Sequence, residues 1–328
     1  MIARNTLLVR LFELVDRVPL PSEYQQPRRG RPYVYPTRLI IKLWLVMVFR
    51  HIHSAYTLHR FLQQDRPEVQ ELREALFGSG PIPSRRTIER RLATLPAALE
   101  AEIASLGQLL VNRIRVWSRE AAAAAIDSAP FHARGGVWHK QHRERGEVPD
   151  SRIDTEAGWT KSGWHGWVYG WKLHTVVTAT RILIPLAATA TAADVGDNTI
   201  APRLIRRLPR GLRWLLGDTA YQDAKLHRLC QERQIQLVAP RRGGPRPRRD
   251  PGAAVRRVLH TVRNTTIERF FAHFKNGFEL LDRVPTRGRT RTRLLLIGSV
   301  YVYQLVLFLQ LELGQQPLQD FKVLLRTI

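Results

Sequence analysis

The sequence has a single cysteine and no motif of a nucleotide-binding loop. These two features limit the cofactors and metal sites that the protein can have. Cys230 is the only cysteine among 328 residues, which excludes an intrachain disulfide and a thiolate metal cluster. No Gly-x4-Gly-Lys-[Ser/Thr] segment occurs, so we expect no phosphate loop for a nucleotide cofactor. The pairs His139/His142 and His227/Cys230 lack a complementary second pair at zinc spacing, so no structural zinc is predicted.

Negative charge is also scarce. Lysine and arginine number 52 against 28 aspartate and glutamate residues, giving a net charge of +24 and a pI near 11.3. A surplus of this size concentrates polyanions at a surface, and phosphate contacts dominate affinity for nucleic acids. The composition therefore favours a nucleic-acid partner. A basic protein from an arginine-rich genome would show the same balance, since charge alone says nothing about fold.

The N-terminus has no charged, apolar and small-residue pattern of a secretory signal, so we expect a cytoplasmic protein. One segment, Leu294 to Leu311, carries no charge over 18 positions and reaches the length of a membrane span. Because Ser299, Gln304 and Gln310 interrupt it, we interpret it as a core helix that covers the sheet of a second domain. No membrane partner is expected.

The length is sufficient for about two domains. Residues 1–115 are predicted to be helical, with helices at 36–50, 67–77 and 106–117. Ser84 is a good N-cap for a further, arginine-rich helix over residues 85–92. Helix, turn and basic helix resemble a helix-turn-helix whose second helix lies on DNA; the alternative is a surface helix with solvated arginines. The predicted DNA contacts are Arg85, Arg86, Arg90 and Arg91.

Residues 116–328 are predicted to form an α/β (α+β) domain with a mixed sheet flanked by helices. Strands are expected at 122–127, 171–178, 182–190, 212–217 and 236–239. Helices are expected at 197–207, 223–233 and 265–275, followed by the apolar C-terminal helix. The first three strands are connected as antiparallel neighbours.

Three carboxylates stand where such a fold can bring them together. Asp127 and Asp218 follow apolar strands, and Glu268 lies on a later helix. A carboxylate beside an apolar strand is costly unless it is paired or binds a metal, and Mg²⁺ and Mn²⁺ prefer oxygen ligands. We therefore predict that the three residues are catalytic and hold two divalent ions, which clamp the attacking and leaving oxygens of a phosphodiester. Asp194, Asp197, Asp223 and Glu232 are competing acidic residues. Asp223 is predicted to cap the helix after Asp218, whereas Asp194 and Asp197 follow a strand and are candidate caps of the next helix.

Four stretches carry a family resemblance: "AIDSAPFHARG", "YGWKLHTVV", "LLGDTAYQD" and "NTTIERFFAHFK". In the order of these stretches, and in the strands and helices in which they are expected to lie, the chain resembles the DDE transposases of bacterial insertion sequences, in the IS-four/IS-five superfamily. The resemblance covers roughly residues 36–311. The resemblance implies an RNase H-like catalytic domain that cleaves and joins strands. It implies double-stranded DNA partners (terminal inverted repeats and target DNA), a homodimer or higher assembly, and a location at the bacterial nucleoid.

The helix motif of that family is often Tyr-x2-Arg-x3-Glu-x6-Lys. Glu268 and Lys275 keep its second half, whereas Thr261 and Asn264 replace the tyrosine and arginine. Arg263 or Arg269 is expected to supply the missing cation, and all three basic residues (Lys275, Arg269 and Arg263) are predicted to contact DNA. Two other functions stay open: an RNase H-like DNA nuclease without transposition, and a domesticated or decayed transposase that only binds DNA.

Tryptophans gather between the first two predicted strands, among basic residues: Trp138, Trp159, Trp164, Trp167 and Trp171. Flat rings beside cations can stack on unpaired bases, and the alternative is a small aromatic core. We favour the core for Trp171 and leave the others open. His132 and His174 are left out of the metal site, because core and surface histidines are commoner than ligands.

Overall fold

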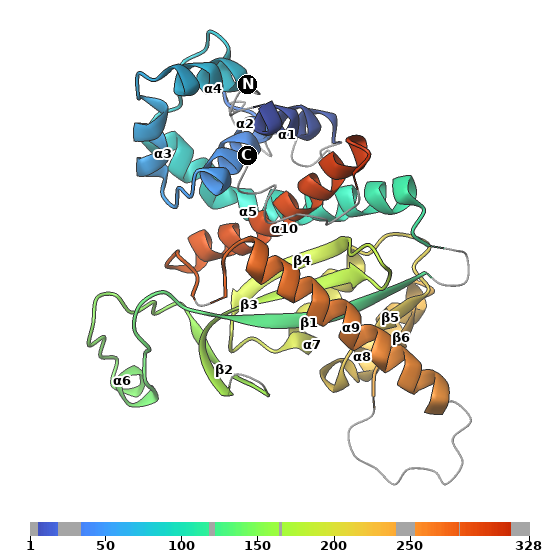
Figure 1. Cartoon of the computed structure of the whole chain (residues 1–328). Helices are drawn as coiled ribbons and strands as arrows, with labels where there is room; N and C mark the ends of the chain where they lie inside the picture. The colour runs from blue at the N-terminus through green and yellow to red at the C-terminus, as the bar shows by residue number, and fades with distance from the viewer. Residues whose placement is uncertain are drawn as a thin grey trace. The chain divides into compact units, whose positions relative to one another are not determined.

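The computed structural model describes residues 6–18, 34–117, 122–163, 166–240, 253–281 and 283–315. The chain divides into two compact units (Figure 1), residues 1–105 with 293–328 and residues 106–292. The sequence-based division at residue 115 assigned the C-terminal segment to the catalytic domain. In the structure, this segment belongs to the unit of N-terminal helices.

The first unit is helical over its described residues. It contains α1 (Thr6–Arg17), α2 (Thr37–Phe49), α3 (Ala55–Leu62), α4 (Pro67–Phe77), the first part of α5 (Arg85–Ile114) and most of α10 (Arg289–Glu312). Ser84 begins α5 as predicted, since its Oγ accepts a hydrogen bond of 3.2 Å from the backbone N–H of Thr87. Two separate helices were expected over this region. The structure instead has one helix of 30 residues that continues through Pro96.

Helix α10 is long and apolar enough to cross a membrane, but 94% of its apolar stretch is buried, as in the core helix of a soluble protein. Its glycine, Gly298, lies against Trp44 of α2, where a Cβ would come within 2.3 Å of the indole Nε1. Its Gln304 donates a hydrogen bond of 2.8 Å to the carbonyl of Ile103 in α5. A core helix is thus confirmed. From Arg293 onward it groups with the N-terminal helices, and its covering of the catalytic sheet stays a prediction.

The second unit is built on one mixed sheet. Its strands are β1 (Ala123–His132), β2 (Gly158–Ser162), β3 (Gly166–Thr178), β4 (Pro185–Ala192), β5 (Trp214–Leu216) and β6 (Gln236–Val238). The order β4-β3-β1-β5-β6 is antiparallel from β4 to β1 and parallel from β1 to β6. Strand β2 pairs with the first part of β3. This is the RNase H-like order predicted from the sequence, with β2 as an addition.

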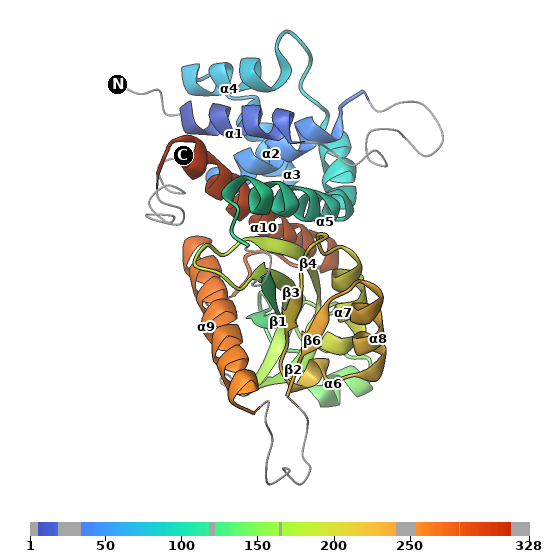
Figure 2. The ribbon, with the colours of Figure 1, turned by 90° about the vertical axis from the view of Figure 1, so that its right-hand side faces the viewer.

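Helices cover both faces of this sheet (Figure 2). One face carries α9 (Ala253–Gly277), which packs Ile267, Phe270 and Phe274 into the core. The other face carries α7 (Asp197–Arg206) and α8 (Ala224–Glu232), while the short α6 (Lys140–Glu144) lies in the connection from β1 to β2. Helix α9 begins before the predicted residue 265, so its first turns were missed in the sequence.

Candidate active site

The register of the parallel strands places Asp127 and Asp218 at the same level. The last residues that pair between β1 and β5 are Ala125 and Leu216, and each aspartate lies two residues beyond its strand's member of that pair. Carboxyl ends of neighbouring parallel strands share one edge of a sheet, where α/β proteins place their ligands. The two residues predicted to be catalytic are therefore brought together by the sheet itself.

Strand β1 does not end at Asp127, as the sequence suggested. It continues to His132 because its antiparallel pairing with β3 extends to the pair His132 and Gly170. The apolar residues of β1 end close to its last pair with β5, Ala125 and Leu216. Beyond that pair the strand continues with β3 as its partner, and the sequence pattern does not show this continuation. Asp127 thus lies inside a long strand, with neighbouring side chains pointing to opposite faces.

Asp127 is held by two hydrogen-bond donors. Arg263 on α9 donates from Nη2 to Oδ2, and the backbone N–H of Ser128 lies 2.8 Å from Oδ1. The carboxylate keeps 22% of its surface exposed. Burial raises the pKa of Asp127 to about 7 and outweighs Arg263 and Ser128, which lower it; the negative charges of Asp218 and Asp197 raise it further. An ionised carboxylate at this position is stabilised by a positive partner.

Asp218 follows β5 and caps the short 3-10 helix η2 (Thr219–Tyr221), accepting a hydrogen bond of 2.8 Å from the backbone N–H of Ala220. Tyr221 is buried beside it. Burial raises the pKa of Tyr221 well above its ordinary value, and the charges of Asp127, Asp197 and Asp218 raise it further.

Asp197, the first residue of α7, contacts three side chains of the sheet. It accepts a hydrogen bond of 2.7 Å from Oγ of Ser128, and its Oδ1 lies 3.4 Å from Nζ of Lys172 and 3.3 Å from Nδ1 of His174. Burial acts to raise the pKa of Asp197, but the contacts with His174, Ser128 and Lys172 hold it below the ordinary value. In the sequence, the only feature that pointed to Asp197 was its position shortly after a predicted strand.

The expected cap at this helix is also different, because the N-cap residue of α7 is Gly196 and no side chain caps the helix. Asp223, by contrast, caps α8 as predicted, with its Oδ1 accepting from the backbone N–H groups of Lys225 and Leu226 at 2.8 and 3.2 Å. Ser128 and Asp127 are adjacent in β1. Their side chains are held from opposite faces of the sheet, Ser128 by α7 and Asp127 by α9.

Glu268 lies on α9, the helix that also carries Arg263. It is exposed on α9, whereas Arg263, Ile267 and Phe270 on the same helix are buried. Within the described parts of the chain, no group of three or more His, Cys, Asp or Glu side chains is disposed to hold a metal ion. The strand register brings together Asp127 and Asp218, and Glu268 as the third ligand stays a prediction.

The two other basic residues predicted on α9 are anchored to the sheet. Arg269 donates from Nη2 to the carbonyl oxygens of Thr180 and Arg181, at 3.1 and 3.0 Å, and so fastens the turn between β3 and β4. Lys275 donates a hydrogen bond of 3.1 Å to the carbonyl of Pro130, with its Nζ 4.9 Å from the centroid of the Phe131 ring. Burial lowers the pKa of Lys275.

The arginines at the start of α5 divide into two kinds. Arg85, Arg86 and Arg90 are exposed. Arg91 is 6% exposed, and its Nη2 lies 3.2 Å from Oγ1 of Thr37 in α2. Arg91 therefore joins two helices of the first unit, and the prediction that it contacts DNA is corrected.

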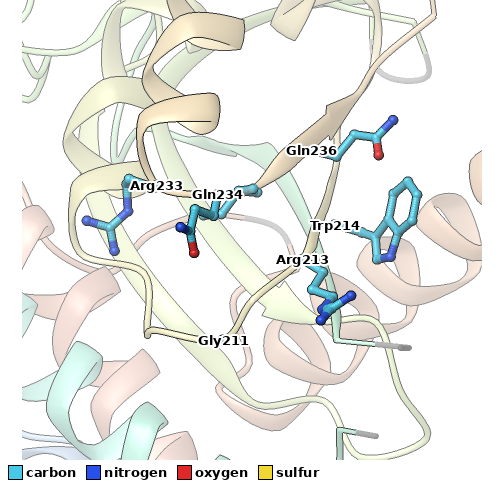
Figure 3. A pocket seen from close by; sticks show the side chains of 7 residues that line it. Gly211, Arg213, Trp214, Arg233, Gln234 and Gln236 are labelled. Carbon is cyan, nitrogen blue, oxygen red and sulfur yellow. The ribbon is translucent and has the colours of Figure 1, made fainter. Parts of the chain in front are cut away.

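A pocket of about 520 Å³ lies in the second unit (Figure 3). Arg213, Trp214 and Gln236 line it at the beginnings of β5 and β6, with Arg233 across the opening. Asp218 follows the other end of β5. The pocket is therefore at the opposite edge of the parallel strands from the carboxylates.

The model of the family described as "Transposase DDE domain" matches residues 119–305. This segment is more than half of the chain and contains Asp127, Asp218 and Glu268. The chain belongs to the DDE transposase family. DDE transposases generally use divalent metals, and the donor set of Asp127 and Asp218 fits such ions, because carboxylate oxygens in a partly buried position favour a hard cation.

The transposase is also similar to solved structures. The piggyBac transposase, in a synaptic complex with hairpin DNA, matches over 99% of this chain and 79% of that chain, with 11% identity and a TM-score of 0.41. The Mos1 transposase, in a paired-end complex with the left transposon end, matches over 86% and 81%, with 10% identity and a TM-score of 0.23. No curated protein sequence matches the chain.

Proposed function

We propose that this transposase binds the ends of a mobile DNA element, cleaves its strands and transfers them to target DNA, with Asp127 and Asp218 at the reaction centre. The observation that carries this proposal is the shared level of the two aspartates beyond the last β1–β5 pair. The family match supplies the reaction class. An exchange of one phosphodiester for another needs no nucleotide cofactor.

Asp127 and Asp218 would hold the divalent ions, and we propose two Mg²⁺ or Mn²⁺ ions. Bound there, such ions supply a stabilising charge to the attacking and leaving oxygens of the phosphodiester. We propose Glu268 as a further ligand on the basis of its place in the helix motif. Glu268 is exposed, so its carboxylate is accessible to an ion.

The proposed partner is double-stranded DNA, first the terminal inverted repeats of the element and then the target. The net charge of +24 supports a polyanionic partner, and Arg85, Arg86 and Arg90 offer exposed cations on one helix. We further propose a homodimer or higher assembly, because two element ends must be held together for joining. Its place of action would be the nucleoid.

A cleavage assay on a duplex that ends in the element's terminal repeat tests this function. Cleavage should require Mg²⁺ or Mn²⁺, and Asp127→Asn and Asp218→Asn should each abolish it while DNA binding persists. Glu268→Gln should do the same if Glu268 is a ligand. Asp223→Asn is the matched control, because asparagine also caps helices and Asp223 lies outside the carboxylate group.

Two results would contradict the proposal. Robust cleavage in excess chelator would exclude the metal mechanism. Cleavage without any preference for terminal repeats would indicate a nuclease that does not transpose. Loss of activity in Asp127→Asn and Asp218→Asn together with full activity in Glu268→Gln would keep the two aspartates and remove Glu268 from the site.

A further inference from the structure

Strands β2 and β3 form a hairpin with an aromatic and basic face. Trp159 pairs with Tyr169 and Lys161 pairs with Trp167 across the two strands. Residues that are directly opposite in an antiparallel pair lie on the same face. We call the side chains of this face, Trp159, Lys161 and Trp167, the hairpin face; Lys161 and Trp167 are exposed and Trp159 is half-buried.

Trp167 is the most exposed of these rings, with 66% of its surface accessible. Its centroid lies 6.3 Å from that of Trp159 in an edge-to-face arrangement, and Trp159 lies 5.3 Å from the ring of Tyr169. Tyr169 is buried and donates from its hydroxyl to the carbonyl of Asp154 at 2.6 Å. The exposed ring is therefore supported by a fixed aromatic base.

Indole N–H groups hold the surrounding chain in place. Trp159 donates a hydrogen bond of 3.0 Å to the carbonyl of Trp138, and Trp138 donates one of 2.7 Å to the carbonyl of Glu147. The guanidinium of Arg143 lies 5.9 Å from the centroid of the Trp138 ring. Cations thus accompany the aromatic rings at the hairpin face and beside it.

Two of the tryptophans named in the sequence, Trp171 and Trp167, differ in how far they are buried. Trp171 is fully buried and donates from Nε1 to Oδ2 of Asp154 at 3.2 Å, which confirms its place in the core. Trp167 is not in the core. Trp164 lies outside the described residues. A fixed, exposed ring beside a lysine presents both a π-surface and a positive charge, and these are the two features that bind unpaired nucleotides without sequence preference.

We propose that Trp167 stacks on an unpaired base of the DNA that this transposase binds, with Trp159 supporting the ring and Lys161 facing the phosphate backbone. The proposal rests on the proposed function and adds a specific contact to it. Trp167 lies eight residues along β3 from Thr175, the partner of Asp127, or about 26 Å at ~3.3 Å per residue. The stacking surface is therefore separate from the carboxylates.

The test compares two DNA ligands: a blunt duplex and the same duplex with an unpaired thymidine tail. Wild-type protein should prefer the tailed duplex. Trp167→Ala should weaken binding of the tailed duplex roughly 5- to 150-fold, the range that follows from removing one base-stacking aromatic ring. It should leave the affinity for the blunt duplex unchanged. Trp167→Phe should retain most of the preference because it keeps a ring.

Leu281→Ala is the matched control, because Leu281 is 64% exposed and apolar but lies outside the hairpin. Equal binding of the two duplexes by the wild type, or an unchanged preference in Trp167→Ala, would overturn the stacking proposal. Metal-dependent cleavage would then still support the proposed function. If the wild type bound neither duplex, both would fail. A change of oligomeric mass in Trp167→Ala without loss of tail preference would assign the hairpin face to a second copy of the chain.

Discussion

Arg263 on α9 donates a hydrogen bond to Asp127 in the middle of β1. Arg263 is buried, and the second nitrogen of its guanidinium, Nη1, donates to Oδ1 of Asn264 at 2.7 Å. The contact places a positive charge against Asp127. Burial raises the pKa of this carboxylate, and the charge of Arg263 lowers it. Arg263 therefore acts as the protein's own counter-ion for Asp127, and a divalent ion at Asp127 would share or replace it.

The first prediction follows from this competition. Arg263→Gln should reduce the free energy of unfolding of the metal-free protein by roughly 1.5–3 kcal/mol, because Asp127 loses a charged hydrogen-bond partner. Mn²⁺ should then stabilise the variant more than the wild type. Thermal unfolding with and without Mn²⁺, together with calorimetric titration of Mn²⁺, measures both effects.

Arg269→Gln provides the control for this experiment, because Arg269 is on the same helix but binds the turn at Thr180 and Arg181. It should alter stability without altering Mn²⁺ affinity. Equal Mn²⁺ affinity in Arg263→Gln and the wild type would show that the guanidinium does not compete with the ion.

The second prediction concerns Asp197. Because its folded pKa lies below its ordinary value of 3.8, its ionisation stabilises the fold above that value, and this stability is lost as the pH falls through the folded pKa. Asp197→Asn should therefore unfold more easily at neutral pH by roughly 1–3 kcal/mol, and the difference should disappear on acidification below pH 4.

Chemical denaturation at a series of pH values measures the difference. Asp194→Asn, at a more exposed neighbouring carboxylate, should show a smaller effect. A constant difference between Asp197→Asn and the wild type from neutral to acidic pH would show that the ionised form of Asp197 is not the source of the stability.

Much of the second unit was predictable, because each strand and helix carries its own local pattern. The order of strands, helices and turns gave the RNase H-like sheet, and Asp127 and Asp218 were recognised at the ends of apolar runs. The extension of β1 was not predictable, because Ser128, Pro130 and His132 break the apolar pattern. They remain in the strand only through pairing with β3.

The partners of the aspartates could be predicted only in part. Arg263 was one of two candidates for the cation missing from the helix motif, but its contact with Asp127 could not be derived from the sequence. Arg263 is 136 residues from Asp127, and Asp197 is 69 residues from Ser128. Such contacts depend on how α9 and α7 lie on the sheet, which no local periodicity encodes. The apolar pattern of α10 likewise shows that the helix is buried, but not which helices bury it.

The third prediction concerns DNA binding by α5. If Arg85, Arg86 and Arg90 contact phosphates, replacing all three by glutamine should reduce the slope of log affinity against log salt by up to about 2.7, at ~0.9 per contact. Binding to duplex DNA at several salt concentrations gives the slope. Arg60 and Arg66, which are exposed elsewhere in the first unit, provide the control substitutions. An unchanged slope in the triple variant would move recognition to another surface.

The fourth prediction concerns Lys275, which the structure anchors on the carbonyl of Pro130. Lys275→Ala should cost roughly 1 kcal/mol of stability, because one hydrogen bond is lost. If Lys275 also contacts phosphate, the rate of strand joining should fall roughly 10- to 100-fold, since a cation–phosphate hydrogen bond is worth ~1.5–3 kcal/mol. Lys275→Arg should recover part of that rate. Reduced stability with a wild-type joining rate in Lys275→Ala would leave this lysine with a structural role alone.

The last prediction concerns Glu102 in the first unit. Its side chain is buried, and neither carboxylate oxygen has a hydrogen-bond partner among the described residues. Burial raises its pKa to about 8, although the charge of Arg38 lowers it. The protonated form is thus favoured by folding, so its contribution to stability is full below pH 4.5 and is lost as the pH rises through 8.

Glu102→Gln removes this titration while keeping the shape of the side chain. The wild type should lose stability between pH 4.5 and 8, whereas the variant should show a flatter profile and should be the more stable protein above pH 8. Denaturant unfolding across this range measures both profiles, with Glu74→Gln, exposed on α4, as the control. The two stability profiles diverge only if Glu102 is protonated in the folded protein and ionised in the unfolded chain. Parallel profiles for Glu102→Gln and the wild type would therefore show that Glu102 does not change its protonation on unfolding.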